Sequence, residues 1–317
     1  MQSRFIDFIR DNNLASANDK ILLGVSSGID SMVMVNLFRK SGFNISVAHC
    51  NFSLRGEESD GDEKLVEHEC EINGIKLHQI RFETEGFAKE HKLSVQVAAR
   101  NLRYNWFNKL CDEFGYTKIA IAHNRDDVAE TLILNLSRGT GLKGLSGIKV
   151  VNGNVIRPLL FASRDEITRY AIENDVSFHN DSSNASVKYA RNRIRHKVIP
   201  ELEQLNPSAK KSIAETAKHV NEAWNLVDDY LINLKDKLVK HDNNRTLFEI
   251  HGLSNEKYSK LFLFEELSSF GFSYETLEQV LSSIEGQPGK VFYSSTHQLL
   301  RDRDFFILTE KKDCVQP

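Results

Sequence analysis

Between about residues 20 and 160, short apolar runs alternate with longer amphipathic segments. The apolar runs have the length of buried strands, and the segments between them carry apolar residues at helical spacing. This alternation is typical of a parallel sheet with helices on both faces. The pattern predicts strands near residues 20–26, 44–50, 75–81, 117–122 and 154–157. It predicts helices near residues 30–41, 58–73, 94–114, 125–138 and 163–174.

The pattern changes after about residue 205. Pro200 and Pro207 flank the end of a basic helix, and a long helical stretch follows from about Ser208 to Lys240. We therefore expect two domains, residues 1–205 and a smaller, mainly helical domain over residues 206–317. In the second domain the pattern predicts helices around Asn255–Phe270 and Tyr274–Ser283, and short strands near residues 290–295 and 304–309.

The loop after the first predicted strand is rich in small residues. The strand runs directly into Ser26-Ser-Gly-Ile-Asp-Ser31, and a helix follows from about Asp30. Small side chains let backbone N–H groups approach a ligand closely, and the helix N-terminus adds unpaired N–H groups and a positive dipole end. A phosphate suits such a loop. The segment lacks both the Gly-Lys-Ser/Thr ending of a Walker loop and the three glycines of a dinucleotide fingerprint, so neither class follows.

A second group of polar residues follows the fourth predicted strand. The segment AHNRDDVAET, residues 122–131, turns from strand into helix, so Asp127 and Glu130 lie on one helical face. Carboxylates beside a triphosphate would hold Mg²⁺, which prefers oxygen ligands, and Asp30 is the expected second contributor. The alternative is that these acidic residues only complement the helix dipole. Because ligands bind beyond the carboxyl ends of parallel strands, the position favours a site.

Two further segments are candidates for contacting a nucleotide. The loop Arg138–Gly147 is rich in glycine, and Gly139 and Gly141 would allow the backbone to approach a ligand closely. A flexible linker is the alternative. Arg100 and Arg103 lie one turn apart on a predicted helix, where they would either clamp a phosphate or only face solvent.

A basic cluster precedes the predicted domain boundary. Six of the ten residues 188–197, KYARNRIRHK, are basic or histidine. The whole chain has 41 Lys and Arg against 44 Asp and Glu, a net charge of −3, and so has no general attraction to nucleic acid. The cluster therefore predicts a local contact with RNA phosphates or another anion. A solvated helix face is the alternative.

Composition excludes several other kinds of site. The four cysteines, Cys50, Cys70, Cys111 and Cys314, lie far apart with no C-x-x-C pair. This spacing argues against a zinc ribbon, an iron–sulfur cluster and a thiol relay. No apolar run approaches the roughly 18 residues of a membrane span. We therefore expect a cytoplasmic protein with no membrane partner.

The motifs, in this order and spacing, resemble one known family. SSGIDS, AHNRDDVAET, RGTGLKGLSGI, IRPLL, NDSSN and RNRIRHKVIPEL closely resemble the tRNA(Ile)-lysidine synthetases, which are N-type ATP pyrophosphatases, over roughly residues 20–205. The resemblance implies an adenine nucleotide α-hydrolase-like α/β fold. It also implies a ligase that adenylates the wobble cytidine of tRNA(Ile) with a CAU anticodon at the expense of ATP. Free L-lysine would then be joined to C2 of this base, with release of AMP and pyrophosphate.

The resemblance and the motifs together assign roles to individual residues. The residues expected to hold ATP are Ser26, Ser27, Gly28, Ile29, Asp30, Ser31, Arg103, Gly139 and Gly141. The expected Mg²⁺ ligands are Asp30 and Asp127, which also count among the catalytic residues. The resemblance places His123 near the α-phosphate, Glu130 near the lysine amine and Arg195 against the nucleotide or the transition-state charge. The expected tRNA contacts are Lys188, Arg191, Arg193 and Lys197.

This chain departs from the family pattern at two positions. Ser27 stands where the family usually has glycine. Serine tolerates positive φ poorly and adds a hydroxymethyl group where the backbone should meet phosphate, although its hydroxyl could itself donate a hydrogen bond. Asn124 stands where the family often has histidine, which suggests that only His123 is needed.

Two other functions and the assembly stay open. One is a nucleotide- or RNA-binding module with weakened catalysis, and the other is a different AMP-forming, tRNA-modifying enzyme of the same superfamily. Residues 206–317 are expected to support tRNA binding, and we do not expect the further C-terminal tRNA-binding domain that some family members carry. The assembly is left open, with a homodimer as one option.

Overall fold

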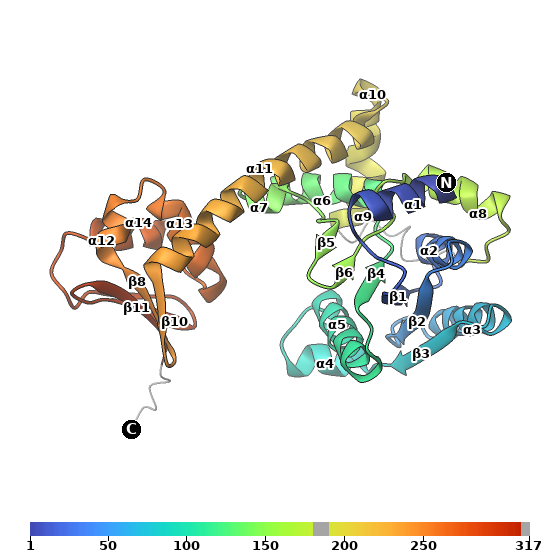
Figure 1. The fold of residues 1–317 in the computed structure, drawn as a ribbon, viewed down its shortest axis with the longest axis horizontal. Helices are drawn as coiled ribbons and strands as arrows, with labels where there is room; N and C mark the ends of the chain where they lie inside the picture. The colour runs from blue at the N-terminus through green and yellow to red at the C-terminus, as the bar shows by residue number, and fades with distance from the viewer. Residues whose placement is uncertain (180–189, 312–317) are drawn as a thin grey trace. The chain divides into compact units, whose positions relative to one another are not determined.

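The computed structural model describes residues 1–179 and 190–311. The chain divides into two units, Met1–Glu222 and Ala223–Pro317. The first unit is built on a six-stranded sheet with the strand order β3-β2-β1-β4-β6-β5 (Figure 1). Five of its strands run parallel: β1 (Lys20–Val25), β2 (Asn44–Asn51), β3 (Lys76–Arg81), β4 (Lys118–Ile121) and β6 (Val155–Ile156). The short β5 (Val151–Asn152) pairs antiparallel with β6 at the edge.

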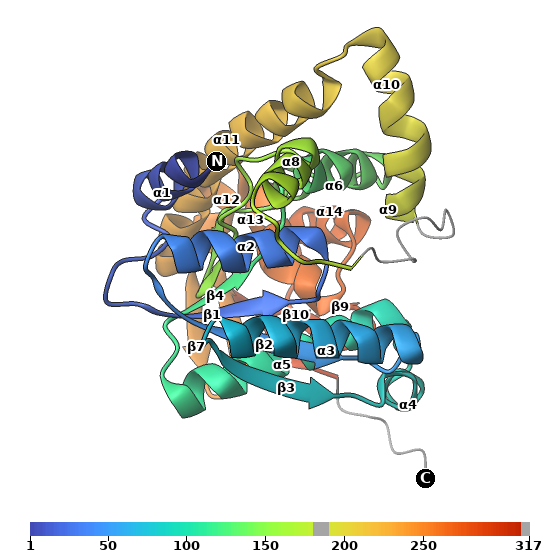
Figure 2. The ribbon, with the colours of Figure 1, turned by 90° about the vertical axis from the view of Figure 1, so that its right-hand side faces the viewer.

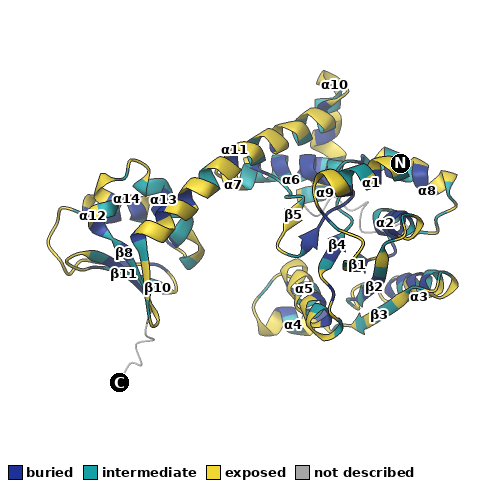
Figure 3. Cartoon of the chain, viewed as in Figure 1, coloured by how far each residue is buried: buried dark blue, intermediate teal, exposed yellow. Residues whose placement is uncertain are grey.

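Helices cover both faces of this sheet because its central strands are apolar on both sides. In β1, Ile21 and Leu23 pack into one core, whereas Leu22 between them packs into the other. The first core also takes side chains from α1 (Gln2–Asp11), α2 (Ile29–Lys40), α3 (Glu57–Ile72) and α8 (Arg164–Glu173). Figure 2 shows the ribbons of α2 and α3 running alongside the strands. The second takes its helical side chains from α5 (Val95–Phe114). Figure 3 shows the resulting contrast between buried strands and exposed outer helix faces.

The remaining elements of the first unit lie between β3 and β4 and after β4 in the chain. After β4 come α6 (Arg125–Ser137) and the short α7 (Leu142–Leu145), and α4 (Thr84–Glu90) precedes α5. The basic segment forms α9 (Ala190–Arg193), the π-helical η2 (Ile194–Val198) and α10 (Ile199–Leu205). The long α11 (Ala209–Leu238) contains the boundary between the two units. The five predicted strands and five predicted helices of this region are all present, each end within one residue of its expected position.

The second unit contains a five-stranded antiparallel sheet in the order β7-β8-β11-β10-β9. Its strands are β7 (Val239–Asp242), β8 (Arg245–Glu249), β9 (Val291–Tyr293), β10 (His297–Arg301) and β11 (Phe305–Glu310). Its helices are α12 (Ile250–Asn255), α13 (Ser259–Leu267) and α14 (Tyr274–Ser282), with the 3₁₀ turn η3 (Ser268–Phe270). The helices pack on the sheet around Phe248, Phe262 and Phe306.

The second unit has the helices that the sequence predicted around residues 255–270 and 274–283, and it also contains this antiparallel sheet. The sequence predicted only the strands that became β9 and β11. The hairpin of β7 and β8 was missed because its strands are short and charged, although the Asn-Asn turn between them is typical of a two-residue hairpin loop. Asn243 in that turn has φ +52°. Within the two described stretches of chain, no helix combines the length and apolar character needed to cross a bilayer.

Candidate active site

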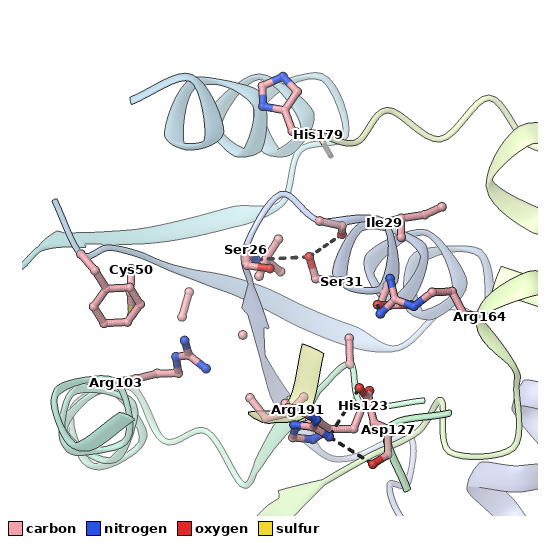
Figure 4. A pocket seen from close by; sticks show the side chains of 18 of the residues that line it. Ser26, Ile29, Ser31, Cys50, Arg103, His123, Asp127, Arg164, His179 and Arg191 are labelled. Carbon is pink, nitrogen blue, oxygen red and sulfur yellow. Dashed lines mark hydrogen bonds and ion pairs between the residues drawn. The ribbon is translucent and has the colours of Figure 1, made fainter. Parts of the chain in front are cut away.

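A pocket of about 370 Å³ opens at the carboxyl ends of β1, β2 and β4. Segments distant in the sequence line it (Figure 4), as expected at this edge of a parallel sheet. The residues of the sequence prediction that line it are Ser26, Gly28, Ile29, Asp30, Ser31, Arg103, His123, Asp127, Arg191 and Arg195. Phe52, whose ring lies 5.2 Å from the guanidinium carbon of Arg103, contributes an aromatic wall.

The loop between β1 and α2 is held by its own polar groups. The backbone N–H of Ser26 donates to the Ser31 hydroxyl at 3.2 Å, and that hydroxyl donates to the Gly28 carbonyl at 2.8 Å. Helix α2 begins at Ile29, directly after Gly28. The Ser31 and Met32 N–H groups bond to the Gly28 carbonyl at 3.0 Å and 3.1 Å, whereas a helix leaves its first N–H groups without intrahelical acceptors, so Ile29 and Asp30 can offer theirs to the pocket together with the positive dipole end. The loop can therefore bind an anion.

Ser27 adopts the conformation that normally requires glycine. Its φ is +64°, and the residue is only 2% exposed. The hydroxyl donates to Asp62 Oδ1 of α3 at 2.6 Å, and Ser27 is not among the residues that line the pocket. The Ser27 hydroxyl, which the sequence identified as a possible hydrogen-bond donor, thus bonds to a carboxylate of α3.

Asp30 and Asp127 are linked by one asparagine. Asn124 is fully buried and caps α6: its Oδ1 accepts from the Asp127 N–H at 3.1 Å, and Asp127 Oδ2 accepts from the Asn124 N–H at 2.9 Å. The Asn124 amide also donates to Asp30 Oδ1 at 3.1 Å. Arg164 of α8 pairs with Asp30 Oδ2 at 2.8 Å. Burial raises the pKa of Asp30, and the charge of Arg164 opposes this rise.

The donor set of Asp30 and Asp127 fits a hard cation bound together with a nucleotide. Within residues 1–179 and 190–311, no three His, Cys, Asp or Glu side chains form a metal-binding group. Mg²⁺ usually needs no such cage, because it binds one or two carboxylates together with phosphate oxygens and water. Two carboxylates beside an anion-binding loop meet that requirement.

Glu130 and two arginines form an ion-pair network on α6. Glu130 is 1% exposed, and both of its oxygens are paired. Arg195 donates through Nε to Oε1 at 2.5 Å and through Nη2 to Oε2 at 3.0 Å. Arg191 donates through Nε to Oε2 at 3.0 Å. Both guanidinium groups also lie near Asp127 Oδ1, at 3.5 Å and 3.6 Å. Arg191, predicted to contact tRNA, thus lines the pocket and pairs with Asp127, which also lines it, and with Glu130, which does not.

His123 is held in its neutral form at the end of β4. Burial lowers the pKa of His123 to about 4, the charge of Asp127 opposes the drop, and the guanidinium of Arg157 adds to it. Arg157 Nε donates to His123 Nδ1 at 3.3 Å. A guanidinium N–H can only donate, so Nδ1 accepts and the hydrogen of the neutral ring sits on Nε2. His123 can therefore donate a hydrogen bond to a ligand.

Other predicted residues lie away from the pocket or outside the description. Gly139 and Gly141 are exposed and do not line it. Arg193 and Lys197 are exposed on the basic segment, where RNA could reach them. Lys188 lies outside the described residues.

Three residues that hold the site together were missed or misjudged. Asn124 was interpreted only as a sign that a second histidine is not needed, although an asparagine three residues before an aspartate at a strand–helix junction indicates a reciprocal helix cap. Arg157 stands as a single charge inside the apolar run Val155-Ile-Arg-Pro-Leu-Leu160, which marks a buried charge with a specific partner. Arg164 carries no comparable sequence signal.

Comparisons with known proteins cover both units. Residues 1–202 match the family model described as a PP-loop domain, and residues 241–311 match the TilS substrate binding domain. The tRNA(Ile)-lysidine synthase of Bacteroides thetaiotaomicron is 39% identical over 308 residues, covering 97% of this chain and 71% of that protein. The chain belongs to the tRNA(Ile)-lysidine synthase family. A second tRNA(Ile)-lysidine synthase, from Parabacteroides distasonis, is 38% identical over 96% of this chain and 70% of its own length.

The fold of this tRNA(Ile)-lysidine synthase family member is also similar to that of a solved structure. The U34-tRNA thiolase NcsA of Methanococcus maripaludis aligns with a TM-score of 0.57 and 23% identity, covering 70% of this chain and 80% of the thiolase. At this identity the likeness concerns the fold alone. The predicted fold class, a mostly parallel sheet with helices on both faces, is confirmed.

Proposed function

We propose that this chain joins free L-lysine to C2 of the wobble cytidine of tRNA(Ile) with a CAU anticodon. ATP is cleaved to AMP and pyrophosphate in the process. The observation that carries the proposal is the convergence of three separated segments on one pocket. The loop of residues 26–31, the start of α6 and the basic segment of α9 and η2 all meet there. Membership of the lysidine synthase family supports the same activity.

In the first step, the O2 atom of cytidine attacks the α-phosphate of ATP, an O–P bond forms, and pyrophosphate leaves. The loop N–H groups and the α2 terminus hold the phosphates. The Nε2–H of His123 donates to an α-phosphate oxygen as negative charge develops, and Arg191 and Arg195 supply positive charge to the same region. Adenylation thereby converts O2 of the base into a leaving group.

In the second step, the lysine ε-amine forms a bond to C2 and AMP leaves. The amine must lose a proton before it can attack, and a carboxylate beside it can hold the ammonium and accept that proton. Asp127 lines the pocket, and Glu130 lies buried behind it, paired with Arg191 and Arg195, which both line the pocket and lie near Asp127. We assign the ammonium to Glu130, assisted by Asp127.

Asp30 and Asp127 are the residues that would hold Mg²⁺. The ion, when bound, offsets the charge that builds on the leaving pyrophosphate. The exposed Arg193 and Lys197 and the substrate-binding domain match in the second unit support a role in holding the tRNA body. Because tRNA, ATP and free lysine meet in the cytoplasm, we expect the reaction to occur there.

The decisive experiment follows labelled phosphate and labelled lysine in parallel. The protein is incubated with α-³²P-labelled ATP, lysine and tRNA(Ile) bearing the CAU anticodon. We expect AMP release and one lysine incorporated per tRNA. Without lysine, labelled adenylate should accumulate on the tRNA.

Two outcomes would contradict the proposal in different ways. Tight ATP binding without any AMP release would favour a binding module. AMP release without lysine incorporation would favour another AMP-forming reaction on tRNA.

A further inference from the structure

Ser27 holds a backbone conformation that side chains rarely adopt, in the middle of the phosphate-binding loop. Its φ of +64° lies in the left-handed region, which glycine enters freely and a residue with a Cβ enters only under constraint. The neighbouring Gly28 and Ile29 line the pocket. The direction of their N–H groups depends on the dihedral angles at residue 27. Whatever fixes Ser27 therefore fixes the phosphate site.

Two hydrogen bonds from outside the loop hold Ser27. Its hydroxyl donates to Asp62 Oδ1 at 2.6 Å, and its carbonyl accepts from the His179 N–H at 3.0 Å. Asp62 is itself fixed, because Arg55 Nη2 lies 2.6 Å from its Oδ2 and His179 Nδ1 lies 3.0 Å from its Oδ1. The constraint on the loop thus comes from α3, from the segment before α3 and from the segment after α8.

We propose that Asp62 is a positioning residue for ATP binding. Its carboxylate accepts a charge-assisted hydrogen bond from Ser27. This bond stabilises a loop conformation that glycine could adopt without such a bond. Asp62 acts through Ser27 and is not among the pocket-lining residues. The inference rests on the ATP-binding part of the proposed function and explains how this chain tolerates a serine in its phosphate loop.

The neighbouring acidic residues of α3 provide a matched control. Asp60 pairs with Arg81 at 3.0 Å, and Glu63 pairs with Arg81 at 2.9 Å. Neither has a hydrogen bond to Ser27 among the contacts of the described residues. Removal of Asp60 therefore removes a similar charge from the same helix without touching the loop.

The first test compares Ser27→Ala with Ser27→Gly. Alanine keeps the Cβ that disfavours positive φ but loses the hydroxyl, whereas glycine loses both. We expect Ser27→Ala to weaken binding of α,β-methylene-ATP about tenfold and Ser27→Gly to change it less than about twofold. Both dissociation constants are measured by calorimetry on the full chain. Equal affinities for both variants and the unmodified protein would overturn the proposal.

The second test asks whether glycine makes Asp62 dispensable. Asp62→Ala should weaken binding about tenfold when residue 27 is serine, yet by less than about twofold in the Ser27→Gly background. Asp62→Asn keeps an acceptor oxygen, so its affinity should lie between those of Asp62→Ala and the unmodified protein. Asp60→Ala should bind the nucleotide analogue like the unmodified protein. A purely structural role would weaken binding equally in both backgrounds, and that result would overturn the proposal.

Thermal melting of each variant separates loss of the loop from loss of the fold. The Ser27 pair keeps the Asp62 cluster intact and so decides the question if Asp62→Ala does not fold. Absence of binding in the unmodified protein would instead refute the proposed function. Binding that is indifferent to all these changes would refute only the role of Asp62.

Discussion

The two ends of the pocket are built on different principles (Figure 4). At the loop end, small side chains and helix N–H groups face the cavity, and Ser27, whose backbone has a positive φ, donates its hydroxyl to Asp62 of α3. At the α6 end, charged groups are already paired with one another. Glu130 holds two guanidinium groups, and Asp127 divides its oxygens between a helix cap and those same arginines.

This difference implies different costs of ligand binding. The loop end is preorganised, so a phosphate that enters displaces water and little else. The α6 end must exchange partners, because phosphates compete with carboxylates for the arginines, and an ammonium group competes with the arginines for Glu130. Changes at the loop should therefore act on nucleotide affinity, and changes on α6 should act on turnover.

The largest effect is expected for Asp127→Asn. The asparagine oxygen can still cap α6, so the melting temperature should change little, but the loss of the charge should reduce lysine incorporation by more than about a thousandfold. Mass spectrometry of digested tRNA measures lysidine. Asp126→Asn is the matched control, because Asp126 lies 3.7 Å from Lys210 and does not line the pocket. Normal turnover in Asp127→Asn would exclude this carboxylate from the chemistry.

Arg195→Ala should have the next largest effect. The substitution removes positive charge from the reacting phosphate and leaves buried Glu130 with one guanidinium partner fewer. We expect turnover to fall by about a hundredfold with a smaller change in the dissociation constant for tRNA. Arg193→Ala, on the exposed side of the same segment, should show the reverse pattern. If Arg195→Ala mainly weakened tRNA binding and Arg193→Ala mainly reduced turnover, the roles of the two arginines would have to be exchanged.

A smaller effect is expected for Lys197→Ala. This exposed residue is predicted to contact a phosphate of the tRNA backbone. Its removal should weaken tRNA binding several-fold and reduce the slope of log K against log salt by about one unit, with turnover at saturating tRNA unchanged. Filter binding at a series of salt concentrations measures the slope. Lys188→Ala is predicted to behave in the same way, and an unchanged slope would remove either residue from the contact.

The smallest effect concerns the pH dependence that His123 imparts. Its pKa is lowered to about 4 in the folded chain, so between pH 4 and the ordinary histidine pKa of 6.5 the unfolded chain binds the extra proton. The contribution of His123 to stability is therefore present above pH 6.5 and is lost as the pH falls towards 4. Denaturant unfolding of His123→Gln should show a shallower loss of stability than the unmodified protein across that window. If the free energy of unfolding of both proteins changed with pH in the same way, the His123 imidazole would not be held neutral in the folded chain.

The elements of the first unit could be predicted from sequence because its strands are short, the central β1 is a buried, largely apolar run, and helical segments with apolar residues at regular spacing separate them. The loop 26–31 and the α6 carboxylates could be placed together because the carboxyl ends of parallel strands lie at the same edge of the sheet. The direction of side chains was harder to predict. Arg191 and Arg195 share a face by their spacing of four, with buried Ile194 beside them, whereas Arg193 points elsewhere.

The glycine-rich loop shows a different limit of sequence interpretation. Gly139 and Gly141 were expected at the nucleotide, yet they lie outside the pocket. The neighbouring Gly144 serves the loop itself, since a Cβ there would fall 1.8 Å from Thr140 Oγ1. Glycine permits close approach in general, and sequence alone does not say whether the approaching group is a ligand or the chain's own side chain.

The buried amide of Asn124 connects the loop after β1 with the start of α6, and this connection makes the pocket more rigid than either segment would be alone. One side chain ties the first turn of α6 to a residue 94 positions earlier in the chain. A shift of α6 would therefore also displace Asp30, so Asp30 and Asp127 are expected to move together. The spacing between the two negative charges is consequently a property of the folded scaffold, set before any substrate arrives.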